Sequence, residues 1–130
     1  MRALALLLLL AACRGDETIS GYSDRATVWR LTELDGAPFA APATLRFPEP
    51  SLALGAGPCN VFRAAQSAPY PWLEIGPVAA TRRACPALEA ETRYFAALEA
   101  MTLAEASDRV LILSDAAGRE MVFVAEPQEN

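Results

Sequence analysis

One stretch near the start of the chain reads Thr27-Val28-Trp29-Arg30-Leu31-Thr32-Glu33-Leu34, with apolar and polar residues in alternation. Alternation with a period of two turns one set of side chains toward a core and the other toward solvent, as in a half-buried β-strand. Asp35-Gly36 follows directly and favours a turn. The pattern of strand and turn recurs along the chain, and this indicates an antiparallel β fold.

Further short strands are predicted downstream, separated by turns that contain Gly or Pro. They cover residues 44–47, 51–54, 59–62, 72–75, 110–113 and 121–124. The last two flank Asp115-Ala116-Ala117-Gly118, which favours a hairpin turn. A total of roughly seven or eight short strands is typical of a small antiparallel barrel or sandwich.

One helix is predicted over residues 86–101. Pro86 suits a first helical turn, and the acidic Glu89 and Glu91 lie early, where the helix dipole favours them. Apolar residues recur at helical spacing: Leu88, Tyr94, Phe95, Leu98 and Met101. The predicted class is therefore mainly β (α+β), with one helix packed on the strands.

The N-terminus indicates export. Met1-Arg2 precedes a run of Ala and Leu that is too short to cross a bilayer and resembles a signal-peptide core. The run ends in Leu10-Ala11-Ala12-Cys13, which resembles the lipobox of bacterial lipoproteins. We therefore predict a signal peptide over residues 1–12 and acylation of Cys13, against the alternatives of an ordinary secretory signal or a buried apolar helix.

Three segments are expected: the signal peptide 1–12, the lipidated cysteine with a polar tether over 13–24, and one domain over 25–126. Gly15 to Ser23 is polar and turn-rich, which suits a tether. Arg14 follows the cysteine, so the sequence lacks an inner-membrane retention signal. We expect an outer-membrane lipoprotein facing the periplasm, with inner-membrane or soluble periplasmic locations as alternatives.

Composition excludes several kinds of chemistry. The formal net charge is −5, which argues against nucleic-acid binding. All basic residues are Arg, and the chain has neither His nor Lys. The absence of these residues excludes catalytic pairs that use His, His-ligated zinc and Schiff-base chemistry. We expect no catalytic residues, no cofactor and no metal site.

Five segments stand in a characteristic order. They are Trp29-Arg30-Leu31 with Asp35-Gly36; Gly57-Pro58-Cys59-Asn60-Val61-Phe62; Thr81-Arg82-Arg83-Ala84-Cys85-Pro86; Glu91, Phe95 and Leu98; and Leu111-Ile112-Leu113 with Asp115 and Gly118. Together they resemble the META domain family, which includes HslJ-like heat-shock lipoproteins, over about residues 27–125. The resemblance implies a small, incomplete antiparallel β-barrel packed with one helix, and no established catalytic activity. Ala64-Ala65-Gln66 stands in place of the family's G-x-Y, so we expect an altered or shortened strand there.

Cys59 and Cys85 are predicted to form a disulfide. Once Cys13 is assigned to lipid, two thiols remain in an oxidising compartment, and both lie in family-like motifs. The alternative is a pair of buried reduced cysteines.

Other candidate residues each have a structural alternative. Asn60 is a candidate for ligand contact or for capping of backbone groups in a turn. Arg82 and Arg83 are candidates for an anionic partner or a lipid headgroup, or are simply solvated. Trp29 and Trp72 are expected in the core rather than on a ligand. No carboxylate dyad is apparent among Glu89, Glu91, Glu99 and Glu105, and glutamates on a helix are expected on its solvated face, so a glycosidase has little support.

The leading functional hypothesis is a non-enzymatic, monomeric envelope lipoprotein with a binding, structural or stress-related role. Its partners would be the membrane, through the acyl anchor, and an unidentified envelope protein or apolar ligand. Two alternatives stay open: a module for apolar ligands or lipids, favoured by an open apolar cleft, and an inhibitor of a secreted hydrolase, favoured by a rigid protruding loop.

Overall fold

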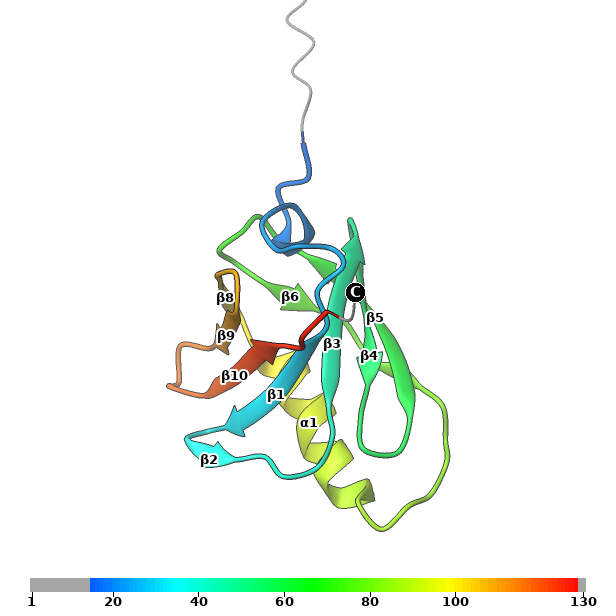
Figure 1. Ribbon diagram of the computed structural model, residues 1–130. Coiled ribbons are helices and arrows are strands. Elements are labelled where there is room, and N and C mark those ends of the chain that lie inside the picture. Colours follow the sequence, from blue (N-terminus) through cyan, green and yellow to red (C-terminus); the bar gives the residue numbers. More distant parts are fainter. Residues whose placement is uncertain (1–14, 129–130) are drawn as a thin grey trace, which may run out of the picture.

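The structure is a computed structural model that describes residues 15–128 (Figure 1). The predicted signal peptide and acylation of Cys13 lie outside these residues. The described part contains a 3-10 helix η1 (Ile19–Gly21), one α-helix and ten strands. In chain order these are β1 (Trp29–Leu34), β2 (Ala37–Pro38), β3 (Thr44–Glu49), β4 (Leu52–Ala56), β5 (Val61–Ser67), β6 (Glu74–Ile75), β7 (Ala79–Ala80), α1 (Leu88–Ala100), β8 (Leu103–Ala106), β9 (Val110–Ser114) and β10 (Glu120–Ala125).

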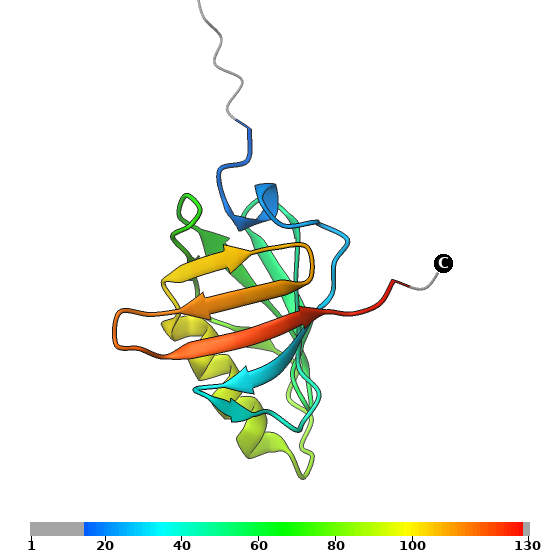
Figure 2. The ribbon, with the colours of Figure 1, turned by 60° about the vertical axis from the view of Figure 1, so that its left-hand side comes forward.

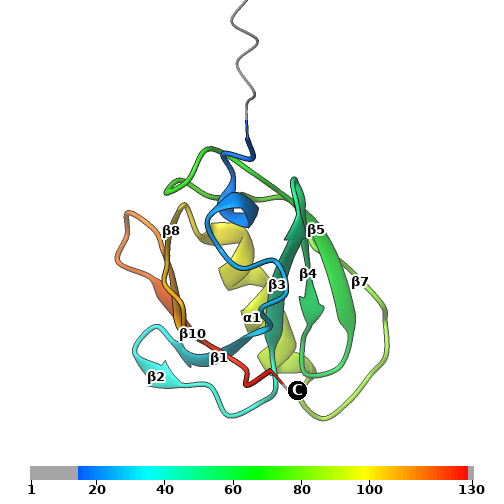
Figure 3. The same cartoon turned by 45° about the horizontal axis from the view of Figure 1, so that its top comes forward.

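The strands form one antiparallel, strongly curved sheet in the order β6-β5-β4-β3-β1-β10-β9-β8, with β2 beside β1 and β7 beside β5. The first and last long strands are neighbours, since Trp29 pairs with Ala125 and Leu34 with Met121. Figure 3 shows α1 in the hollow between the two halves of the sheet. The predicted class, a mainly β antiparallel half-barrel with one helix, is confirmed.

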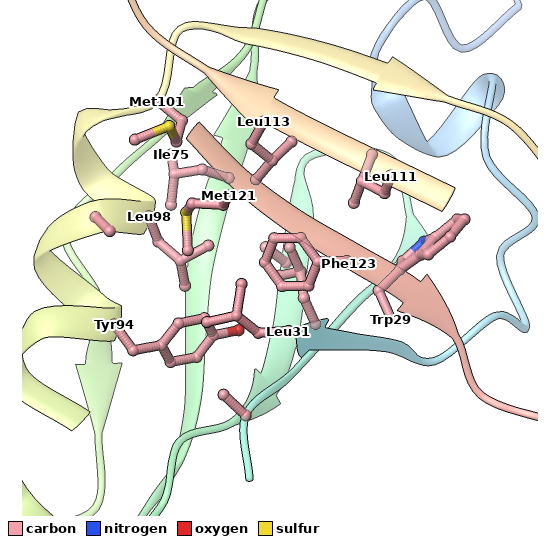
Figure 4. Packing of buried hydrophobic residues seen from close by; sticks show 14 of the residues in the cluster. Trp29, Leu31, Ile75, Tyr94, Leu98, Met101, Leu111, Leu113, Met121 and Phe123 are labelled. Carbon is pink, nitrogen blue, oxygen red and sulfur yellow. The ribbon is translucent and has the colours of Figure 1, made fainter. Parts of the chain in front are cut away.

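The core lies between α1 and the concave face of the sheet (Figure 4). Tyr94, Ala97 and Leu98 of α1 are fully buried against residues such as Leu31 and Phe123. The buried Tyr94 hydroxyl donates to the Thr44 carbonyl at 2.7 Å, which attaches the helix to β3. Burial of the phenol raises the pKa of Tyr94 well above its usual value.

Most predicted elements are observed, and the exceptions have physical causes. The strand that contains Ala64-Ala65-Gln66 was expected to be altered or shortened, but it is β5, which is seven residues long and regular. Its regularity follows because Ala64 and Gln66 point inward and are buried like Phe62. The strand predicted over 72–75 is reduced to Glu74–Ile75. The unpredicted β8 is Ala-rich and gains its conformation from pairing with β9. No helix among residues 15–128 is long and apolar enough to cross a membrane.

The segment interpreted as a polar tether is folded onto the domain from Asp16 onward, so that interpretation is wrong for this segment. Ile19 is fully buried in η1, which contacts β3. The Asp16 carboxylate accepts hydrogen bonds from Thr18 N (2.9 Å), the Ser20 hydroxyl and Arg25 Nη2 (3.1 Å). Figure 2 shows this segment at the upper end of the sheet. Several of its polar residues are hydrogen-bonded to one another, which composition does not reveal.

Candidate groove and disulfide-linked junction

A disulfide joins Cys59 and Cys85, as predicted, with Cα atoms 5.7 Å apart. It connects the loop between β4 and β5 to the segment that precedes α1. Both cysteines are partly buried. The bridge is the covalent part of a junction where three segments of the chain meet.

Glu91 provides the buried part of this junction, so its prediction as a solvated helical glutamate is wrong. Its side chain is 3% exposed. Oε1 accepts from Cys59 N at 3.0 Å and Asn60 N at 2.7 Å, and Oε2 accepts from Asn60 Nδ2 at 2.7 Å. Gly57 leaves room for this carboxylate, because a Cβ there would lie 2.5 Å from Oε1. The family-like spacing placed Glu91 on the helix, but only the fold shows that it faces the loop.

Asn60 uses its whole amide within the junction. Nδ2 donates to Glu91 and to the Arg83 carbonyl at 3.0 Å, while Oδ1 accepts from Arg83 N at 2.6 Å and Thr81 Oγ1 at 3.0 Å. The residue is 4% exposed. These bonds support the structural alternative for Asn60, because no donor or acceptor of its amide is free for a ligand.

Arg82 and Arg83 lie on an exposed segment, residues 81–84, that this junction holds in place. Two bonds from Asn60 fix the backbone of Arg83, and the disulfide fixes Cys85 two residues later. A crevice of about 550 Å³ lies between this segment and α1. The two arginines are thus presented to solvent on a rigid backbone.

A second hollow lies on the outer face of β3, β4 and β5. This groove has a volume of about 610 Å³, within the range of ligand sites. Its apolar lining residues are Val28, Leu54, Val61, Ala79 and Ala80, with the largely buried Phe62 beneath them. Val61 is 62% exposed, which is unusual for a side chain of this type. The groove opens to solvent.

Arg46 and Arg63 flank the apolar surface of the groove. Arg46 pairs with Leu54 on β4, and Leu54 pairs with Arg63 on β5, so the three form one cross-strand row. Two strand spacings separate the arginine Cα atoms by about 10 Å. Among residues 15–128 the ion pairs are Arg25–Asp16 and Arg119–Asp35, so neither groove arginine is neutralised by one.

None of the residues that line the groove is acidic. The groove is therefore basic on a protein that is acidic as a whole. Sequence reasoning missed Arg46 and Arg63, because the row exists only once the register of three strands is known. The alternation of β5, with Val61 and Arg63 exposed between buried residues, was the signal available.

The remaining candidate residues differ in their exposure to solvent. Trp29 is 1% exposed and belongs to the core as expected, but Trp72 is 58% exposed, so its expected core position is wrong. Glu89 and Glu105 are exposed, and Glu99 accepts a hydrogen bond from Val78 N at 2.7 Å. Within the described range, no cluster of three or more His, Cys, Asp or Glu is arranged to hold a metal.

A curved antiparallel sheet filled by a single helix defines the fold class as a small half-barrel. The junction between the loop that contains Cys59 and Asn60 and the segment that contains Cys85 further limits the families to which such a domain can belong. The META domain family model matches residues 24–128, and the chain belongs to this family. The resemblance noted in the sequence is thereby confirmed.

Two solved structures share the fold. A protein from Burkholderia xenovorans, solved by NMR, is 23% identical, with a TM-score of 0.62 over 78% of this chain and 83% of that one. A DUF4847 family protein from Bacteroides vulgatus is 10% identical, with a TM-score of 0.61 over 82% and 96%. Among curated proteins, none matches the sequence. At these identities the two structures establish the fold alone.

Proposed function

We propose that the chain is a non-enzymatic binding protein of the cell envelope, anchored by acyl chains on Cys13, whose groove holds an apolar ligand with an anionic head. The lipobox-like Leu10-Ala11-Ala12-Cys13 supports the anchor. The groove row Arg46–Leu54–Arg63 carries the proposal for the ligand.

The row matches such a ligand in both polarity and charge. Burial of Leu54 and Val61 beneath a hydrocarbon chain would be favourable by roughly 25 cal/mol for each Å² removed from water. Guanidinium groups bind carboxylates and phosphates through paired hydrogen bonds, so two unneutralised arginines select an anionic head. A fatty acid satisfies both requirements.

Titration of the purified protein with a fluorescent fatty acid, dansyl-undecanoate, tests this ligand class. We expect saturable binding that weakens about tenfold or more in Arg46→Gln/Arg63→Gln, consistent with the loss of charge-assisted hydrogen bonds. Arg109→Gln, which replaces an exposed arginine outside the groove, is the matched control. Equal binding by all three proteins, or no saturable binding, would overturn the assignment.

Anchoring is tested separately. Mass spectrometry of the N-terminal peptide should show acyl chains on Cys13, and Cys13→Ser should no longer fractionate with membranes. A wild-type peptide without acyl mass, together with membrane association of the variant, would contradict the anchor.

The segment 81–84 favours a second candidate, inhibition of a secreted protease that cleaves after arginine. An inhibitory loop must be exposed yet rigid, and here Asn60 holds the Arg83 backbone beside the disulfide. Trypsin assays with wild type, Arg82→Ala, Arg83→Ala and the control Arg109→Ala provide the test. Inhibition that depends on Arg82 or Arg83 supports this candidate, whereas simple cleavage of the loop refutes it.

A further inference from the structure

Figure 1 shows η1 and the loop between β5 and β6 at the same end of the molecule. These two parts of the chain carry exposed aromatic side chains. Trp72 is 58% exposed and Tyr22 is 57% exposed. The ring of Tyr22 stacks on that of Tyr70, with centroids 4.5 Å apart. Of the large apolar side chains in residues 15–128, only Val61 and Leu88 are comparably exposed. We call Tyr22, Tyr70 and Trp72 the aromatic end.

The aromatic end is fixed to the segment that follows Cys13. Tyr70 N donates to the Glu17 carbonyl at 2.8 Å, and Tyr22 N donates to the Ile19 carbonyl at 3.0 Å. Ile19 is itself fully buried. The loop that carries Trp72 is held in turn, because Trp72 pairs with Leu103 and the Tyr70 hydroxyl accepts from Ala106 N. The aromatic end is therefore fixed to the segment that contains Glu17 and Ile19.

The chain between the acyl attachment and this folded segment is very short. From Cys13 to Asp16, the first residue held by hydrogen bonds, there are three peptide steps, which span at most about 11 Å. Because the segment from Asp16 to Ser23 is folded on the domain, it adds little freedom to this distance. An acyl chain on Cys13 would therefore hold this end of the domain close to the bilayer surface.

We infer that the aromatic end is a membrane-contact surface, in which the exposed rings of Tyr22 and Trp72 lie against the lipid headgroups around the anchor, while the partly buried Tyr70 supports Tyr22 by stacking. This inference rests on the proposed acyl anchor. Trp and Tyr favour the membrane–water interface because their rings are apolar and their polar atoms remain hydrated. Glu17 and Asp24 are exposed in the same segment, so attraction to anionic lipid does not drive the contact.

Tryptophan fluorescence tests the contact in the mature, membrane-extracted protein after reconstitution into phosphatidylcholine vesicles with or without brominated acyl chains. The chain has two tryptophans, and Trp29 is buried in the core, so it serves as an internal reference. Subtraction of the Trp72→Phe spectrum from that of wild type isolates the emission of Trp72. We expect Trp72 emission to shift to the blue on vesicles and to be lost in large part to bromine, while Trp29 emission is unchanged.

A matched control places a tryptophan at the far end of the molecule. Leu88 is 45% exposed at the start of α1, opposite the N-terminal segment in Figure 1. In Trp72→Phe/Leu88→Trp, bromine should not quench the new tryptophan. Vesicle flotation separates the outcomes. Protein that floats without quenching of Trp72, or with equal quenching at position 88, overturns the contact surface and leaves the anchor intact. Protein that does not float overturns both.

Discussion

Replacement of Glu91 by alanine removes the acceptor for three N–H donors at the junction: Cys59 N, Asn60 N and Asn60 Nδ2. Both Asn60 donors are buried, and a buried donor left without a partner costs about 1–3 kcal/mol. The Cys59 donor is partly exposed and can be satisfied by water. We therefore expect the free energy of unfolding of Glu91→Ala to fall by about 3 kcal/mol, without simple addition of the three bonds.

Urea denaturation of the oxidised protein, followed by tryptophan fluorescence, measures this loss. Glu89→Ala is the matched control, because Glu89 lies two residues away on the same helix but is exposed. Its loss should be about 0.3–1 kcal/mol from the helix dipole alone. Denaturation slopes should remain equal, so that the midpoints report stability.

Glu91→Gln refines the test, because it keeps the shape and removes the charge. Both carboxylate oxygens accept hydrogen bonds, so an amide must turn its NH₂ toward another donor in either orientation. We expect a stability between those of wild type and Glu91→Ala. If Glu91→Ala loses no more stability than Glu89→Ala, the junction does not hold the three segments together and the reasoning is refuted.

Three further predictions concern other parts of the fold. Reduction of the Cys59–Cys85 bridge, whose cysteines are 26 residues apart, should lower the free energy of unfolding by about 3.5 kcal/mol from chain entropy. Urea denaturation with and without reductant measures this loss, and the stability of Cys59→Ser/Cys85→Ser should not change with reductant. Tyr94→Phe should cost about 1 kcal/mol in urea denaturation through loss of the 2.7 Å bond to Thr44, and an unchanged midpoint would contradict this. Burial acts to raise the pKa of Asp16, but hydrogen bonds from Ser20 and Thr18 and the charge of Arg25 outweigh it and lower the pKa below 3.8. The stability that Asp16 contributes is thus present above pH 3.8 and is lost as the pH falls through the lowered pKa of the folded state. The free energy of unfolding of Asp16→Asn should therefore vary less over this acidic range than that of wild type.

Local patterns predicted the elements whose side chains follow a strict period. The alternation in β1, β9 and β10 and the apolar stripe of α1 each bury one face, and the cysteine pair follows from compartment and motif. Features that depend on a distant partner were not predicted. Glu91 looks like any helical glutamate until the Cys59–Asn60 loop is placed over it, and the polar residues after Gly15 resemble a tether until Gln66 and Asp16 bind them.

The groove illustrates the same limit. Arg46, Leu54 and Arg63 are each ordinary outward residues on separate strands, and their alignment depends on the register of two hairpins. Trp72 was misplaced because large aromatics are usually buried, whereas this one is 58% exposed in the loop that Tyr70 N attaches to the Glu17 carbonyl.

Because β1 pairs with β10, the sheet can be completed only after nearly the whole domain is available. Trp29, near the start of the domain, finds its partner in Ala125, near the end. A nascent chain has no partner for that edge of β1 until residues 120–125 have been synthesised, so the high contact order predicts slow completion of the sheet. A chain truncated before Glu120 would leave the adjoining edges of β1 and β9 open, and such unpaired edges template aggregation between molecules.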